Sequence, residues 1–242
     1  MKKVFLGLST VALIAFTSCE KKEAIAVQDA ETVAEGTETS TNYVVDTATS
    51  NVEWRGFKIY ENESAEQGHN GTIKLQSGNI QLENNKIVAG DFIMDTSSIE
   101  SMDLNESPED KAKLDGHLRS PDFLDVEKYP TATFKITSVN AIEGDYNTEI
   151  SGNLKMREEE KNVTFKANVG TEGDKLTIAS EEFTINRQDF GIVFALSKGA
   201  VLKDNVTLRV NIQAEEGEAT AEVADETLDG VTEEPISEDL SK

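Results

Sequence analysis

Cysteine and histidine are almost absent from this chain. Among its 242 residues, Cys19 is the only cysteine, and His69 and His117 are the only histidines. A single cysteine cannot close a disulfide within one chain, and neither histidine has the spacing of a zinc-binding motif. The nucleophile elbow, the P-loop and the dinucleotide-binding fingerprint are also missing. We therefore predict that the protein has no metal site and no cofactor, and that it is not an enzyme.

Positive charge is also scarce. Lysine and arginine number 23, against 46 aspartates and glutamates, which gives a formal net charge of −23 at pH 7. A polyanion would be repelled by this field, and no cluster of basic residues with interleaved aromatics offsets it. Nucleic acid is therefore excluded as a partner. The acidity is typical of a protein that stays soluble in a wet, salty compartment.

The hydrophobic run at the N-terminus is too short for a membrane span. Lys2 and Lys3 precede an apolar stretch over 4–16, and small residues and then Cys19 follow it. This order is typical of an export signal, and the lone cysteine resembles the lipid-acceptor site of a bacterial lipoprotein. The alternative is that Cys19 merely lies within the signal segment.

Both ends of the chain are expected to lie outside the folded domain. We predict a lipoprotein signal peptide over 1–18, lipid attachment at Cys19, and a flexible tether over 19–42 that is rich in Glu, Thr and Ala. The mature protein would be exported and held by its lipid in the bacterial envelope, at the periplasmic or surface face of the outer membrane. Residues 215–242 are rich in acids and lack aromatics, so we expect a disordered tail. The alternative is a tail that binds a partner.

The central part of the chain, 43–214, has the pattern of an all-β domain. Apolar and polar residues alternate in short segments, from 43–45 to 206–212, and turns rich in Gly and Asn separate them. The regular alternation of strands and helices that indicates a parallel sheet is missing. Many half-apolar strands either stack as two sheets or close on themselves, and closure removes the exposed edges. We therefore predict an antiparallel β-barrel.

Two helical pieces are expected between the strands. A proline near its start and leucines at helical spacing predict a short amphipathic helix over 108–117. A second short helix is expected to begin at Ser120 as N-cap, with Pro121 and Asp122 in its first turn. Tandem helical pieces between strands are typical of a plug or lid at one end of a sheet structure.

Several motifs resemble those of the YceI-like family. The stretch GHLRSPDFLDVEKYPTATF, at 116–134, is similar to the family signature, although Leu124 stands where a second Phe is usual. The segments YVVDTATSNVEWRGFK, HNGTIKLQSGNI and FTINRQDFGI resemble further family motifs in the same order, over 43–214. The resemblance implies a lipocalin-like, elongated antiparallel barrel in the envelope. It also implies that the lumen holds an isoprenoid lipid such as a prenyl quinone or prenyl phosphate.

The inward faces of the predicted strands are aliphatic and aromatic without charges, which suits a long branched hydrocarbon. From them we select as candidate ligand contacts Trp54, Phe92, Phe134, Ile136, Leu154, Phe165, Phe183 and Leu208. The alternative is that these side chains fill a solid core. The protein would then be a structural or protein-binding module of the envelope.

Candidate polar contacts are few. Arg119 and Arg187 are candidates for the head group of the lipid, because an arginine at the barrel mouth can meet a phosphate or quinone oxygen. A structural pairing of Arg with Asp, such as Asp189, is the alternative. The carboxylates over 122–127 could act as an acid and a base in a hydrolase. Carboxylates are so common in this chain that their proximity carries little information.

Overall fold

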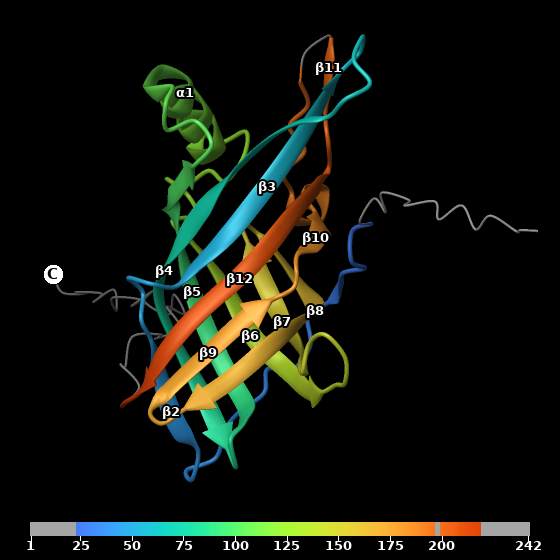
Figure 1. Ribbon diagram of the computed structural model, residues 1–242. Coiled ribbons are helices and arrows are strands. Elements are labelled where there is room, and N and C mark those ends of the chain that lie inside the picture. Colours follow the sequence, from blue (N-terminus) through green and yellow to red (C-terminus); the bar gives the residue numbers. More distant parts are fainter. Residues whose placement is uncertain (1–22, 197–198, 219–242) are drawn as a thin grey trace, which may run out of the picture.

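In the computed structural model, residues 23–196 and 199–218 are described (Figure 1). The predicted signal peptide, Cys19 and residues 219–242 lie outside this part of the chain. The elements are β1 (Gln28–Asp29), β2 (Thr41–Val45), β3 (Asn51–Tyr60), β4 (Gln67–Glu83), β5 (Lys86–Ser101), α1 (Pro108–Arg119), β6 (Thr131–Ala141), β7 (Thr148–Met156), β8 (Glu159–Glu172), β9 (Lys175–Ser180), β10 (Phe183–Asn186), the 3-10 helix η1 (Arg187–Phe190), β11 (Ala200–Leu202) and β12 (Asn205–Glu216). Among the described residues, no helix is long and apolar enough to cross a membrane.

The strands form one antiparallel sheet that closes on itself. Neighbours follow the order β8-β7-β6-β5-β4-β2-β12, and β9 pairs with both β12 and β8. At the other end of the barrel, β3 takes the place of β2 between β4 and β12. The prediction of an elongated antiparallel β-barrel is confirmed.

Alternation of side chains places the core inside the barrel. In β9, for example, Leu176 and Ile178 are buried while the intervening residues are exposed. The largest cluster of buried apolar side chains draws on strands around the whole barrel, and a smaller cluster around Trp54 and Leu124 lies under α1. The apolar residues at every second position of the strands therefore form one continuous apolar interior.

The helical region contains one helix rather than two. Helix α1 runs from Pro108 to Arg119, two residues longer than predicted. The prediction that Ser120 begins a second helix is wrong: Ser120 is the C-cap of α1, and its hydroxyl donates to the carbonyl of His117 (2.8 Å). Asp122 and the residues after it form successive turns. By local preference, a Ser-Pro pair favours the start of a helix. Here Ser120 instead caps the C-terminus of the preceding helix, α1.

The N-terminal segment is attached to the barrel, so the predicted flexible tether over 19–42 is wrong for the described part, 23–42. Strand β1 pairs with β8, and the backbone N–H of Ile25 donates to the carbonyl of Thr184 in β10 (2.7 Å). Ile25 and Val27 pack against the main core. Among the described strands, β10 pairs only with β12, so its other edge is open to the N-terminal segment. This segment bonds to β10 at Ile25 and to β8 through β1, and it therefore links the two strands.

Further hydrogen bonds hold this segment as it passes over the outside of the barrel. The N–H of Glu31 donates to the Asn153 side chain of β7 (3.0 Å), and that of Gly36 donates to Gln81 of β4 (3.0 Å). These partners lie more than forty positions away in sequence, so no local pattern announces them. The predicted acidic tail over 215–242 also begins too early, because Glu216 still belongs to β12 and pairs with Tyr43.

Candidate ligand-binding cavity

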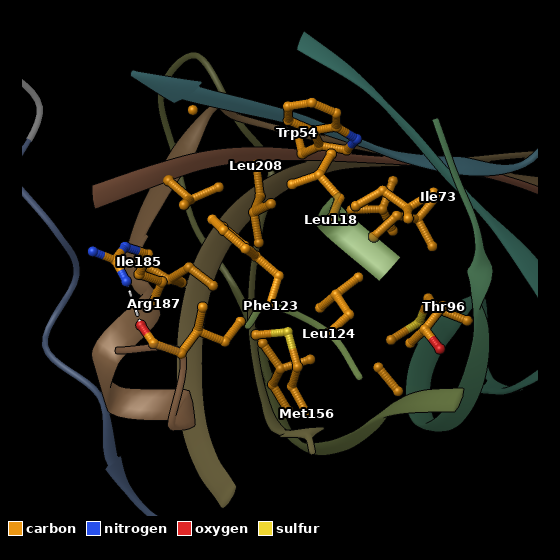
Figure 2. A pocket seen from close by; sticks show the side chains of 18 of the residues that line it. Trp54, Ile73, Thr96, Leu118, Phe123, Leu124, Met156, Ile185, Arg187 and Leu208 are labelled. Atoms are coloured by element: carbon orange, nitrogen blue, oxygen red, sulfur yellow. Dashed lines mark hydrogen bonds between the residues drawn. The ribbon is translucent and has the colours of Figure 1, made fainter. Parts of the chain in front are cut away.

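A cavity of about 370 Å³ occupies the barrel interior on the side of α1. Its wall includes all eight side chains that were selected from the sequence, Trp54, Phe92, Phe134, Ile136, Leu154, Phe165, Phe183 and Leu208. Figure 2 shows Trp54, Phe123 and Met156 around this space. The interior of the barrel is therefore hollow at this end. Because every second side chain of each strand points inward, residues that are distant in sequence line the same wall.

Four phenylalanines form a row along the cavity wall. Successive ring centroids lie 6.2 Å apart for Phe92 and Phe134, 5.7 Å for Phe134 and Phe165, and 4.7 Å for Phe165 and Phe183. Gly152 of β7 makes room for this row, since a Cβ there would lie 2.3 Å from Cζ of Phe134. The row presents broad apolar faces, which suit a hydrocarbon chain.

The cover of the cavity comes from α1, the turns after it and the segment after η1. Leu114 and Leu118 of α1 and Phe123 line the cavity from this side. The ring of His117 packs edge-on against Phe123 and Phe194, with centroid distances of 5.0 and 4.7 Å. The alternation of the strands could not select these residues as cavity contacts, because they lie on a helix and on loops. The helical spacing of Leu114 and Leu118 predicted the helix but not the cavity that it covers.

A buried carboxylate fixes α1 to the barrel. Asp115 is 6% exposed, and it accepts hydrogen bonds from the backbone N–H (2.7 Å) and the hydroxyl (2.8 Å) of Ser101 in β5. Lys111 lies 3.1 Å from its other oxygen. Burial alone would raise the pKa of Asp115, but the bonds from Ser101 and the Lys111 ammonium lower it below its usual value. The position of the cover therefore depends on an ionised Asp115.

The two arginines proposed for the head group have different positions. Arg119 does not line the cavity; it donates to the carbonyls of Ser97 (2.9 Å) and Ile99 (2.6 Å) and so ties α1 to β5. Arg187 does line the cavity, and it is only 4% exposed. Arg119 is therefore not a contact for the head group. The side-chain N–H groups of Arg187 also donate to protein oxygens, so Arg187 has few donors left for a ligand.

Arg187 is a structural residue of the cavity wall. It donates to the carbonyls of Ile192 and Lys203. It pairs with Asp204 (2.8 Å) and not with Asp189, the partner that the sequence suggested. Figure 2 shows Arg187 in the cavity wall, with one of its hydrogen bonds as a dashed line. Burial lowers the pKa of Arg187, and the charge of Asp204 opposes that shift. Among the described residues, no group of His, Cys, Asp and Glu side chains could hold a metal ion.

Comparison with known proteins identifies the family. The sequence profile of the YceI-like domain matches residues 43–214. This chain belongs to the YceI-like domain family. The YceI-like domain therefore contains the strands that form the barrel and the cavity, whereas the segment over 23–42 lies outside the matched residues.

Similar proteins occur in Pseudomonas putida and Salmonella arizonae. A UPF0312 protein of Pseudomonas putida is 36% identical over 129 residues, which cover 50% of this chain and 62% of the relative. The YceI protein of Salmonella arizonae is 38% identical over 104 residues, or 43% of this chain and 50% of the relative. The chain thus spans about three-fifths or less of the length of these relatives.

Two solved structures have a similar fold. Burkholderia cenocepacia BcnA has a TM-score of 0.53 at 19% identity, over 70% of this chain and 98% of that one. A polyisoprenoid-binding domain from Saccharophagus degradans, implicated in plant cell wall breakdown, has a TM-score of 0.51 at 11% identity, over 72% and 98% of the two chains. At these identities the likeness concerns the fold of the YceI-like domain.

Proposed function

We propose that this protein is an envelope lipoprotein that binds an isoprenoid lipid in its barrel, to carry or sequester it. The observation that carries the proposal is the cavity of about 370 Å³ with an almost wholly apolar wall. An engineered apolar cavity of about 150 Å³ stays dry and binds benzene, so this one has room for a larger hydrocarbon. The polyisoprenoid-binding domain of Saccharophagus degradans, which shares the fold, supports this ligand class.

Burial of the tail would supply most of the affinity. Each methylene moved from water into an apolar site contributes about 0.8 kcal/mol, and a prenyl chain offers several carbons per unit. The row of phenylalanines from Phe92 to Phe183 gives this tail a continuous apolar surface. A prenyl quinone and a prenyl phosphate share such a tail, and they differ at the head group. The proposal includes no catalytic step.

The test combines recovery of the ligand with an internal optical probe. Trp54 is the only tryptophan of the chain and lies in the cavity wall, so its fluorescence reports on occupancy. We expect organic extraction and mass spectrometry of protein from its native host to yield an isoprenoid, and an added prenyl quinone to quench Trp54. A protein that carries no lipid and shows no quenching would instead support a structural or protein-binding module.

Membrane attachment through Cys19 is part of the proposal. The first described residue, Glu23, is four positions after Cys19, so an extended chain would reach only ~14 Å between them. Because the segment from residue 23 onwards is bound to the barrel, this short reach would hold the barrel close to the membrane. We expect Cys19→Ser to move the protein into the soluble fraction. Wild-type protein should be released by detergent but not by high salt.

A further inference from the structure

The wall of the barrel has a gap between β8 and β10. At the end away from α1 (Figure 1), β9 joins β8 to β12, and the backbone N–H of Glu181 donates to the carbonyl of Lys166 in β8 (2.8 Å). Towards α1, β10 continues beside β12, and none of the backbone pairings among the described strands joins it to β8. We call the gap between 159–166 of β8 and β10 the seam. At its α1 end, Arg157 donates to the carbonyl of Gly191 (3.2 Å).

Residues 23–29, at the blue start of the described chain in Figure 1, lie along the seam. On one side, the backbone N–H of Ile25 donates to the carbonyl of Thr184 in β10 (2.7 Å), and on the other side β1 pairs with β8 over two residues. The side chains of Ile25 and Val27 pack against the main core. A short piece of chain with few hydrogen bonds therefore takes the place of direct pairing between β8 and β10.

The cavity lies directly behind the seam. Phe165 of β8 and Phe183 of β10 line it, and their rings stack across the seam with centroids 4.7 Å apart and an interplanar angle of 8°. Val163 and Ile185 also line the cavity from these two strands, and Figure 2 shows Ile185 in the wall. Apolar side chains thus close the seam behind residues 23–29. Such contacts can separate without the loss of a hydrogen bond, and they offer a hydrocarbon an apolar path.

The two ends of the barrel are closed more firmly than the seam. At the end away from α1, packed side chains such as Ile80 and Leu176 fill the interior. At the α1 end, the buried Asp115 accepts two hydrogen bonds from Ser101, and Arg119 donates two more to backbone carbonyls of β5. Hydrogen bonds that involve buried or charged groups are costly to break. The seam is therefore the part of the wall that opens most easily.

Residues 23–29 can leave the seam while the rest of the N-terminal segment stays in place. The backbone of Glu31 makes two hydrogen bonds with the side chain of Asn153 in β7 (3.0 and 2.7 Å), and Asn153 is only 3% exposed. Further along the segment, two more backbone N–H groups donate to β6 and β4. Because the chain is fixed from Glu31 onwards and weakly held before it, the hinge of this movement lies at Ala30.

We propose that the seam is a lateral gate, through which the lipid enters and leaves the cavity when residues 23–29 swing outwards. This inference rests on the proposed function, including the attachment at Cys19. Residue 23 is four positions after Cys19, so the seam would lie close to the membrane. A prenyl tail could then pass from the bilayer into the cavity along apolar side chains. It would avoid most of the contact with water, which is unfavourable in proportion to the apolar area exposed.

The test measures how fast a ligand enters and leaves. Phosphatidylcholine vesicles supply a benzoquinone with a geranylgeranyl tail, and vesicles without it accept the released ligand. The emission of Trp54 follows binding to the chain from residue 19 onwards carrying Cys19→Ser, which retains every described residue. Ile25→Ser combined with Val27→Ser weakens the closed gate. We expect uptake and release to become about tenfold faster and the affinity to stay unchanged, because the cavity wall is intact. Ile25→Ala alone should give a smaller acceleration, and it replaces the double variant if that variant does not fold.

Two matched controls separate the seam from other routes. Val33→Ser makes the same kind of change on the same segment, but beyond the hinge. Arg119→Ala loosens the cover at the α1 end and changes no side chain that lines the cavity. Both should exchange ligand within about twofold of the wild-type rate. Seam variants that exchange at the wild-type rate, or an equal acceleration by Arg119→Ala, would overturn the gate while the proposed function stands. A wild type that binds no ligand at equilibrium would remove the proposed function, and the gate with it.

Discussion

The two ends of the barrel differ in what their alternating strands enclose. At the end where β2 and β9 complete the sheet, Ile80, Leu82 and Leu176 are almost fully buried, and none of them lines the cavity. At the α1 end, side chains of the same kinds surround a space of about 370 Å³. Hydrophobic burial stabilises the first end through direct packing. At the second end, apolar side chains face the cavity instead of packing against each other, so a ligand can bury their surface.

The two ends also differ in what holds them together. Two buried polar side chains hold the cover over the cavity: Asp115 accepts from Ser101, and Arg187 donates to the carbonyl of Ile192. Such networks fix geometry, and they fail when one partner is lost. The filled end therefore acts as the stable base of the barrel, and the hollow end depends on a few specific contacts.

The largest expected effect contrasts two buried isoleucines. Ile80 lies in the filled end, whereas Ile178 lines the cavity. We expect Ile80→Ala to lower the free energy of unfolding by about 4 kcal/mol, because the truncated side chain leaves a void that its tightly packed neighbours cannot fill. For Ile178→Ala we expect about 2 kcal/mol, since this side chain already faces empty space and loses fewer contacts. Urea unfolding of ligand-free protein measures both values. Equal losses would argue against a filled and a hollow end.

A smaller effect is expected from the carboxylate that holds the cover. Asp115→Ala should cost about 3 kcal/mol at pH 7, because two donors of the buried Ser101 lose their acceptor. The folded-state pKa of Asp115 is lowered. Its contribution is therefore present above the unfolded-state pKa of about 3.9 and is lost as the pH falls through the folded-state pKa.

Unfolding curves at pH 7 and at pH 3 or below measure this dependence. The difference between wild type and Asp115→Ala should shrink at the lower pH. Asp110→Ala is the control, since Asp110 lies on the same helix, is exposed and, within the part of the chain that the structure describes, pairs only with the exposed Lys113. Its effect should stay within about 0.5 kcal/mol at either pH. A pH-independent cost for Asp115→Ala would show that its charge does not hold the cover.

The sequence predicted the strands and the cavity wall well because alternation is a local signal. Phe134 and Phe165 could be assigned to one interior from their neighbours alone. The contacts that fix the cover could not be predicted from the sequence. Asp115 and Ser101 have no pattern that marks them as partners, and only the packing of α1 against β5 brings them together. The N-terminal segment has no period, and its partners are remote in sequence, so the sequence predicts a tether where the structure has a bound segment.

The smallest expected effect on stability comes from filling each end with a larger side chain. Ala214 is 2% exposed in the filled end, so Ala214→Phe should cost about 2 kcal/mol through overpacking. Ala132 lines the cavity, and Ala132→Phe has room for its ring, so we expect a change below about 1 kcal/mol. Its affinity for a prenyl ligand, followed by Trp54 emission, should nevertheless fall at least tenfold, because the ring takes the place of the tail. An Ala132→Phe variant that binds as well as the wild type would mean that the ligand lies elsewhere.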